Sequence, residues 1–498
     1  MNIKPLVAFC LFLCSFLSQA NTIRIGQISD LHYMAPELLV VRGSAFDNYV
    51  MRDRKLLYDS PAILRAAVQN LLNEKVDIVL VSGDLTKDGE LLSHEGVAKT
   101  LQPLLDRGVK VLVIPGNHDI NNPFALSFYG DTTHAAATVS ADDFSKIYGD
   151  FGYKSAISKD PNSLSYVSEP VPGLRILCLD GIKYYNNTFI SKGASADARV
   201  TKGILKPETM VWIRTQIAQA KAQGKQLVGM IHHGVVEHFD YESVLAAPYI
   251  LDNSAELQRT LLLAGVKVVF TGHFHASDIS RVDDRFGNHL YDVETGSIVT
   301  YPCPYRIMEL SGNTLTIQTK HIEKIDTYSS ESINFQRYAQ KKLEKVVPEI
   351  LSSYLAKYYT SVSTTIPEYA PSFIKVPQEK VLADMVLKYL STSGTTLLLA
   401  NFRGNENLAD SAVHKRKEFI KDVDELIGDF ARKSSGVFLA PITSEVFKRT
   451  AMFRKLKDAS KSIWDNRVEK SYRGRDYKFQ LHEPINDLNL TIELGKLK

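Results

Sequence analysis

The sequence predicts an α/β (α+β) protein: a layered β-sandwich flanked by helices, followed by a second, mostly α-helical domain. Short Val/Ile/Leu runs alternate with amphipathic stretches from residue 23 to about 320, which is typical of strands covered on both faces. Near residue 325 the pattern changes to longer helical periodicities. The 498 residues, 44% hydrophobic and 23% charged, are enough for two domains with ordinary globular cores.

Residues 1–20 have the layout of a secretory signal peptide. Lys4 is their only charge, the run LVAFCLFLCSFL is apolar, and the segment ends in the small residue Ala20. The run is too short to span a bilayer comfortably, and no later segment is expected to be transmembrane. A lipoprotein acylated at Cys14 is less favoured, because the bulky Leu13 precedes the cysteine. The sequence therefore predicts an exported protein, periplasmic or secreted.

The strands predicted in residues 21–327 are, in order, TIRIGQIS, DIVLVS, VKVLVI, LRILCLD, KQLVGMI, VKVVF, HLYDVET, YRIMEL and LTIQTK. Helical patterns such as SPAILRAAVQNLLNE and PETMVWIRTQIAQAKAQ separate several of them. The last strands alternate apolar and polar residues more regularly, as expected for antiparallel pairs.

Residues 328–498 form the predicted helical domain, which we expect to fold separately and to make few contacts with the candidate site. Its helices are expected in SINFQRYAQKKLEKVVPEILSSYLAKYY, VLADMVLKYL, VHKRKEFIKDVDELIGDFARK and TSEVFKRTAMFRKLKDASKSIW, and YKFQLH and LNLTIEL alternate like a closing hairpin. Residues 331–498 hold 28 Lys and Arg against 21 Asp and Glu, a net charge of +7. The basic residues are scattered, which favours solvated helix faces over a surface for nucleic acid polymers.

Two cysteines remain once the signal peptide is removed. Cys178 lies in a predicted strand and Cys303 in the Pro-rich stretch YPCPYR. An exported protein could join them, but a buried strand cysteine more often packs as a small apolar residue, so free thiols are favoured. Neither has the spacing of a thiolate zinc site.

Five predicted strands end in residues of metal-binding type. These are Asp30 and His32, then Asp84, then Asn117 and His118, then His232 and His233, and last His273 and His275. In an open α/β sheet, ligands collect outside the carboxyl ends of the strands, so one rim would receive all of them. A single histidine here would more often be structural, whereas five coincident strand ends favour a metal site.

The local spacings agree with that interpretation. Asp30 and His32 are two residues apart, as are His273 and His275, so each pair projects from one face of an extended chain. The two oxygens of Asp84 suit a carboxylate that bridges two cations. Glycines immediately precede Asp84 and His273 and allow the backbone to turn sharply there.

The motifs DLH, GDLTKDG, GNHD, HH and GHFH, in this order, resemble the signature of the calcineurin-like metallophosphoesterases, over about residues 23–320. The resemblance implies an α/β sandwich with a dinuclear metal centre and His118 as the acid near the leaving group. It also implies two ligand sets, with Asp30, His32 and His275 on one metal, Asn117, His232 and His273 on the other, and Asp84 bridging them.

Two roles stay open at this level. Either member of the pair His232 and His233 could be the ligand, and His232 is favoured because its neighbour can then support it. Asp119 either orients His118 or merely caps the loop. Nitrogen and oxygen ligands without sulfur fit Mn, Fe or Zn and do not distinguish among them.

The expected activity is hydrolysis of a small-molecule phosphoester, in which a hydroxide bridging the two metals attacks phosphorus. The stretch from GNHDINNPFA through DDFSKIYGDFGY resembles the bacterial cyclic-nucleotide phosphodiesterase branch, whose members can carry a helical C-terminal domain. Near the ligands the sequence has aromatic residues and one cation, Lys87, which favours phosphodiesters as substrates. The aromatic residues are Tyr33, Phe124, Phe128 and Phe274. The alternatives are a phosphomonoesterase or nucleotidase, and a non-catalytic interaction scaffold, which would require degraded ligands. The sequence sets no oligomeric state.

Overall fold

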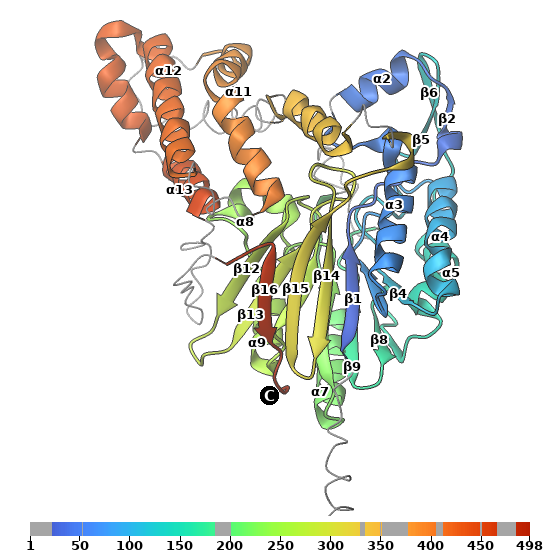
Figure 1. The fold of residues 1–498 in the computed structure, drawn as a ribbon. Helices are drawn as coiled ribbons and strands as arrows, with labels where there is room; N and C mark the ends of the chain where they lie inside the picture. The colour runs from blue at the N-terminus through green and yellow to red at the C-terminus, as the bar shows by residue number, and fades with distance from the viewer. Residues whose placement is uncertain are drawn as a thin grey trace, which may run out of the picture.

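The computed structural model describes residues 22–51, 53–184, 201–328, 334–348, 350, 377–404, 412–448, 451–465 and 485–498. The predicted signal peptide and the segment YKFQLH lie outside these residues. Two large sheets stack face to face with helices on their outer faces, and the C-terminal helices stand at one end of the sandwich (Figure 1). The fold is the layered sandwich flanked by helices that the sequence predicts, followed by a helical region.

The first sheet has the strand order β16-β15-β14-β1-β3-β4. Its strands β1, β3 and β4 are parallel, and β14, β15 and β16 are added antiparallel to one another along the edge of β1. Their bounds are β1 Ile23–Ile28, β3 Ile78–Val81, β4 Lys110–Val113, β14 Pro304–Ser311, β15 Thr314–His321 and β16 Asn489–Glu493.

The second sheet has the order β12-β13-β11-β10-β9-β8-β7, and its four central strands, β13, β11, β10 and β9, are parallel. The bounds are β7 Ser158–Lys159, β8 Tyr166–Val171, β9 Leu174–Leu179, β10 Gln226–Ile231, β11 Val268–Thr271, β12 Asp278–Asp283 and β13 His289–Glu294. A small third sheet contains β2 Leu39–Val41, β5 Leu126–Tyr129 and β6 Thr132–Ala135. Every strand that the sequence predicts in residues 21–327 is present.

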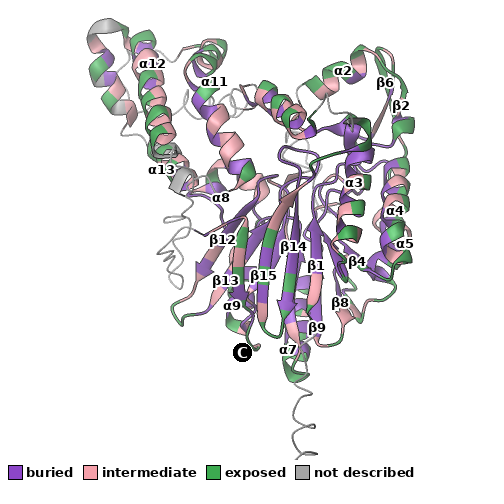
Figure 2. Ribbon diagram, viewed as in Figure 1, coloured by how far each residue is buried: buried purple, intermediate pink, exposed green. Residues whose placement is uncertain are grey.

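The period-two pattern of the strands divides the apolar residues between two cores. Along β10, Val228 and Met230 face the core shared with the first sheet, while Leu227 and Ile231 face the opposite side. That opposite side is covered by α7 (Pro207–Ala222) and α9 (Ser254–Ala264). The helices α3 (Ser60–Asn73) and α4 (Leu91–Asp106) cover the part of the first sheet formed by β1, β3 and β4. The outward face of β15 and β16 is partly exposed (Figure 2). Shorter helices are α2 (Ser44–Met51), α5 (Ala141–Ile147) and α8 (Glu242–Leu245).

The helices expected after residue 328 are present wherever the structure describes them. Residues 335–348 are helical, followed by α11 (Glu379–Arg403), α12 (Ala412–Lys448) and α13 (Ala451–Asp465). The long α12 is interrupted at Gly436, where φ is 75°. No helix among the described residues is both long and apolar enough to cross a membrane.

The C-terminal segment LNLTIEL has a partner that the sequence analysis does not name, while the expected partner YKFQLH lies outside the described residues. LNLTIEL contains β16, which pairs with β15, placing Ile492 opposite Leu315. The reason is local: Ile492 is 2% exposed and joins the main core, which also receives Phe335 and Leu343 from the helix 335–348. Residues on both sides of the predicted boundary at residue 327 therefore contribute to one core.

Cys178 and Cys303 are both free and buried. Burial raises the pKa of Cys178 to about 12, as expected for a thiol in an apolar strand environment. The expectation of free, packed thiols agrees with this structure.

Candidate metal centre

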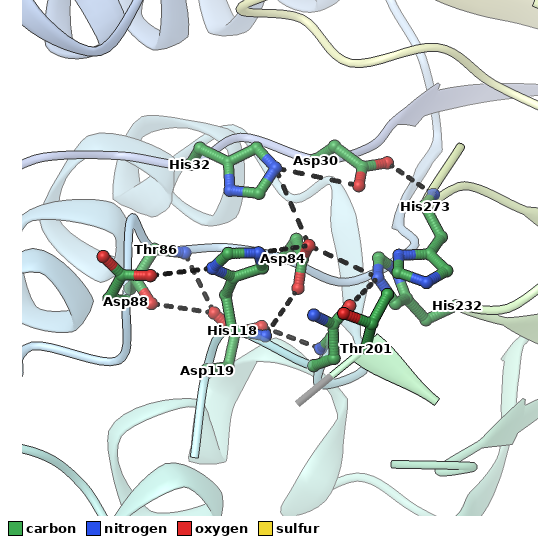
Figure 3. A network of polar contacts seen from close by, with 12 residues as sticks. Asp30, His32, Asp84, Thr86, Asp88, His118, Asp119, Thr201, His232 and His273 are labelled. Atoms are coloured by element: carbon green, nitrogen blue, oxygen red, sulfur yellow. Dashed lines mark hydrogen bonds and ion pairs between the residues drawn. The ribbon is translucent and has the colours of Figure 1, made fainter. Parts of the chain in front are cut away.

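The strand ends that the sequence singles out meet at one rim of the sandwich. Strands β1, β3 and β4 of the first sheet and β10 and β11 of the second deliver their following loops to the same place (Figure 3). All seven residues predicted as metal ligands are at most 5% exposed: Asp30, His32, Asp84, Asn117, His232, His273 and His275. So many buried polar and charged groups require specific partners, because burying an uncompensated charge is costly.

The backbone at this rim is unusual. Five of the predicted ligands have positive φ, namely Asp30 (51°), His32 (37°), Asp84 (48°), His273 (79°) and His275 (73°). Non-glycine residues rarely adopt this region, and such strained positions cluster at functional sites. Close backbone approach adds to the constraint, because a Cβ on Gly116 would lie 2.0 Å from the Asp84 nitrogen.

The first group of side chains contains Asp30, His32 and His275. The Nε2 atoms of His32 and His275 are 3.0 Å apart, and His275 Nε2 is 3.3 Å from Asp30 Oδ1. Asp30 Oδ1 is buried and accepts no hydrogen bond, so its lone pairs face the two imidazoles. Ligand atoms of all three residues lie within 4.8 Å of one another, which is compact enough to surround one cation.

The second group contains Asp84, His232 and His273, again with ligand atoms within 4.8 Å. Asp84 Oδ2 is 3.4 Å from His232 Nε2 and 3.6 Å from His32 Nε2. Asp84 therefore stands between the two groups, where a bridging carboxylate would lie. Asn117 joins this group through Oδ1, which is 3.1 Å from His232 Nε2.

The geometry also separates His232 from His233. His232 Nδ1 lies 2.8 Å from the carbonyl oxygen of Ser82, an arrangement that assigns the ring proton to Nδ1 and leaves the Nε2 lone pair facing Asp84. His233 Nε2 instead lies 2.6 Å from the carbonyl oxygen of Thr201, and its ring packs beside His273. The arrangement favours His232 as the ligand, with His233 as a supporting neighbour.

His118 is the most open member of the cluster, with a side chain 26% exposed. Its Nδ1 lies 2.9 Å from Asp88 Oδ1, and its Nε2 lies 3.9 Å from Asp84 Oδ2. Burial would lower the pKa of His118, but the charges of Asp84 and Asp88 raise it above its usual value. A histidine that retains its proton next to the cluster is suited to donate that proton to a substrate oxygen.

Asp88 is a residue that the sequence analysis did not assign. Its other oxygen, Oδ2, accepts hydrogen bonds from Lys87 Nζ at 2.6 Å and from the Tyr49 hydroxyl at 2.8 Å. These contacts fix Asp88, and Asp88 in turn fixes the ring of His118. The available signal was its place in GDLTKDG, four residues after Asp84, but spacing alone does not reveal its partner.

Of the two roles considered for Asp119, its described contacts favour capping of the loop. Its carboxylate accepts hydrogen bonds from the backbone nitrogens of Leu85 (3.0 Å), Thr86 (2.9 Å) and Gly116 (2.8 Å), and from Thr86 Oγ1 (2.8 Å). The side chain lies behind the cluster, so it ties the loop after β3 to the loop after β4. Burial, together with the charge of Asp84, raises the pKa of Asp119 to about 7.

Two cations absent from the sequence-based site also reach the rim. Arg54 Nε is 3.3 Å from His275 Nδ1, and Arg54 Nη2 donates to the carbonyl of Phe274 at 3.3 Å. Burial and the charge of Arg54 lower the pKa of His275 to about 4, and burial and Lys55 hold the pKa of His32 well below its usual value. The segment containing Arg54 and Lys55 matches no motif, so its position follows only from the fold.

Only some of the residues expected to line a pocket for a diester are placed where they could contact a substrate. Phe128 and Tyr33 are core residues, 0% and 7% exposed, while Phe124 is 40% exposed. Lys87 is buried between Asp88 and Glu90 and is not available to a substrate.

Phe274 is the remaining aromatic, and it lies between two candidate ligands in the chain. Its ring packs against Tyr249, with centroids 4.9 Å apart, and against Phe239 at 5.8 Å. The same apolar cluster includes Ala459 and Ile463 of α13. The C-terminal helices therefore contact the loop that carries His273 and His275.

Comparison with known proteins identifies the family. Residues 23–277 match the family model described as calcineurin-like phosphoesterase. The chain belongs to this family. A "Probable cyclic nucleotide phosphodiesterase" of Vesicomyosocius okutanii subsp. Calyptogena okutanii is 32% identical over 65 residues, covering 13% of this chain and 27% of the relative. One of Synechococcus sp. is 30% identical over 104 residues, covering 21% and 34%. The alignments thus span about a third or less of these curated relatives.

Solved structures of phosphatases are also similar in part. A dimetal phosphatase from Danio rerio is 16% identical, with 60% of this chain and 96% of that chain covered and a TM-score of 0.43. A purple acid phosphatase from yellow lupin is 14% identical, with 61% and 52% covered and a TM-score of 0.35.

The residues of this calcineurin-like phosphoesterase fit the metal ions that the family resemblance implies. The two groups offer imidazole nitrogens and carboxylate oxygens, with a buried and unpartnered oxygen on Asp30. The site favours positive charge: burial would lower the pKa of His232, but the charge of Asp84 raises it to about 9. A bound cation would take the place of that proton, since a ligating imidazole must be unprotonated at the metal.

Proposed function

We propose that this chain is an exported enzyme that hydrolyses phosphodiesters, foremost 3′,5′-cyclic nucleotides, at a dinuclear metal centre. The observation that supports it best is Asp84, whose carboxylate lies within 3.6 Å of an imidazole nitrogen of each ligand group. The proposed ligands are Asp30, His32 and His275 for one ion, Asn117, His232 and His273 for the other, and Asp84 for both. The cyclic-nucleotide substrate is supported by the names of the curated relatives.

The reaction assigns a specific task to each residue. Bound Mn, Fe or Zn ions would supply Lewis acidity, which activates water and offsets charge on the phosphoryl oxygens. His118 lies on the open side and donates the proton of Nε2 to the leaving oxygen. Asp88 accepts the hydrogen bond from Nδ1 of His118 and holds the ring in that orientation. Asn117 adds an amide oxygen without adding negative charge.

A second candidate is a phosphomonoesterase or nucleotidase. It is favoured by Arg54, because a phosphomonoester carries more negative charge than a diester and gains more from an added cation. The scaffold alternative is disfavoured, because none of the proposed ligands has been replaced and the described rim brings them together.

Steady-state kinetics on the metal-loaded chain starting at residue 21 test the proposal. We expect kcat/KM to be higher for cyclic AMP and bis(p-nitrophenyl) phosphate than for p-nitrophenyl phosphate. A tenfold preference for the monoester, about 1.4 kcal/mol in transition-state binding, would replace the diesterase proposal with the phosphatase one. Absence of turnover with all three would favour the scaffold.

Export is part of the proposal and is supported by the composition of residues 1–20. Expression of the full chain in a bacterial host should yield periplasmic protein that begins at Asn21. Recovery of the uncleaved chain from the cytoplasm would contradict it.

A further inference from the structure

Arg54 places a positive charge next to the proposed metal ligands. Its side chain is partly buried beside His275, a proposed metal ligand, and among the described residues it forms no ion pair with a carboxylate. Other partly buried arginines do form such pairs, for example Arg24 with Glu74 and Arg175 with Glu169. A guanidinium next to bound cations is unfavourable unless an anion lies between them.

The hydrogen bonds of His275 indicate what happens to Arg54 when a metal binds. His275 Nδ1 lies 3.3 Å from both Arg54 Nε and Thr300 Oγ1. With Nε2 on a metal, Nδ1 carries the proton and donates it to the Thr300 hydroxyl, so it no longer accepts from Arg54. Among the residues that the structure describes, the guanidinium then keeps only its hydrogen bond to the Phe274 carbonyl, which leaves most of its N–H groups for a ligand.

The surrounding chain holds this segment at the rim. The nitrogen of Leu56 donates to the carbonyl of Val299 at 2.7 Å, which ties the segment to the loop that follows β13. The guanidinium carbon of Arg54 lies 5.6 Å from the ring centroid of Phe402 in α11. Lys342, in the helix 335–348, donates to the carbonyl of Val50 at 2.5 Å. The helices after residue 328 thus contact both Arg54 and the end of α2 that precedes it.

We propose that Arg54 binds the non-bridging oxygens of the substrate phosphoryl group, and that Phe402 of the helical region holds Arg54 in place. The inference rests on the proposed function for the identity of the ligand as a phosphoester. A planar guanidinium matches two phosphoryl oxygens, and such charge-assisted bonds are among the stronger ones in proteins. A monoester dianion gains more from this contact than a diester monoanion.

The direct test is calorimetric titration of inorganic phosphate into the metal-loaded chain. We expect Arg54→Gln to weaken phosphate binding about tenfold or more, on the scale of a charged hydrogen bond. Arg42→Gln is the matched control, because Arg42 also lies over aromatic rings but pairs with Asp47 on the surface, and it should leave the affinity unchanged. Unchanged affinity in Arg54→Gln would overturn the proposal. Loss of metal from this variant would also overturn it, because Arg54 would then act only by supporting His275.

A second variant tests the role of the helical region. Phe402→Ala keeps the guanidinium but removes its aromatic contact, and it should weaken phosphate binding a few-fold, as expected for one cation–π contact. Wild-type affinity in Phe402→Ala would refute the positioning by α11.

Turnover separates this inference from the proposed function. If the chain hydrolyses no phosphoester but binds phosphate in a way that depends on Arg54, the inference is supported and the proposed function is contradicted. If Arg54→Gln hydrolyses phosphoesters normally, with unchanged KM and phosphate affinity, the proposed function is supported and the inference about Arg54 is contradicted. With both correct, Arg54→Gln lowers kcat/KM more for p-nitrophenyl phosphate than for bis(p-nitrophenyl) phosphate.

Discussion

The rim of the sandwich and the C-terminal helical region use charged residues in opposite ways. At the rim, Asp30, His32 and Asp84 are almost fully buried, and each is held by contacts with loops that follow other strands. On the helices, charges lie at the surface in pairs such as Lys421 with Glu425, whose side chains are 75% and 52% exposed. Exposed pairs of that kind contribute little to stability. The candidate ligands are therefore concentrated at the rim, and the helical region contacts the rim loops.

The largest effect on metal binding and activity is expected when the carboxylate between the two ligand groups is removed. Asp84→Asn should lose bound metal and reduce turnover at least about a thousandfold, because Asp84 faces histidines of both groups. Elemental analysis and kinetics on the same preparation check this. The control is Asp180→Asn, another buried carboxylate, which bonds to Leu164 and Tyr184 and not to the cluster. Full metal content in Asp84→Asn would contradict the bridging role.

His118→Gln should separate proton donation from metal binding. We expect kcat to fall about a hundredfold to ten-thousandfold while metal content stays near wild type, because His118 contacts the cluster from its open side. His134→Gln, on the exposed strand β6, should have no effect. If His118→Gln lost both metals and kept its activity per bound metal, the residue would be a ligand instead.

The contribution of the C-terminal strand can be measured as stability. Ile492→Ala should lower the free energy of unfolding by about 2–4 kcal/mol, because Ile492 packs in the core of the sandwich. Urea denaturation measures the change, and Thr491→Ala, whose side chain is exposed, should stay within about 0.5 kcal/mol of wild type. Equal stability of the two variants would support a sandwich that is complete without β16.

Asp88→Asn should alter the pH dependence more than the maximal rate. Asp88 helps to raise the pKa of His118, so loss of its charge lowers that pKa. His118 must be protonated to donate, and the alkaline limb of the kcat profile should therefore move to lower pH, with kcat reduced about 10- to 100-fold.

The matched control is Tyr49→Phe. It removes the hydrogen bond to the other oxygen of Asp88 but keeps the contact between Asp88 and His118. The alkaline limb of its kcat profile should therefore stay close to the wild-type position. An Asp88→Asn profile superimposable on wild type would contradict the pairing.

Sequence reasoning could predict the rim because its residues follow buried strands in short motifs. The runs before Asp84 and His232 are apolar enough to predict strands, and parallel strands bring their ends to one edge. Contacts formed by the fold were not predictable. Arg54 matches no motif, Asp119 lies next to His118 in the chain but faces the other way, and β16 pairs with a strand about 175 residues earlier.

The most direct test of the account is the metal content of the purified chain set against its activity. We predict two ions per chain, loss of phosphoester hydrolysis when a chelator removes them, and recovery when Mn²⁺ is added back, because Asp84 joins two separate ligand groups. Turnover that persists undiminished in chain shown by elemental analysis to be free of metal would contradict the central claim.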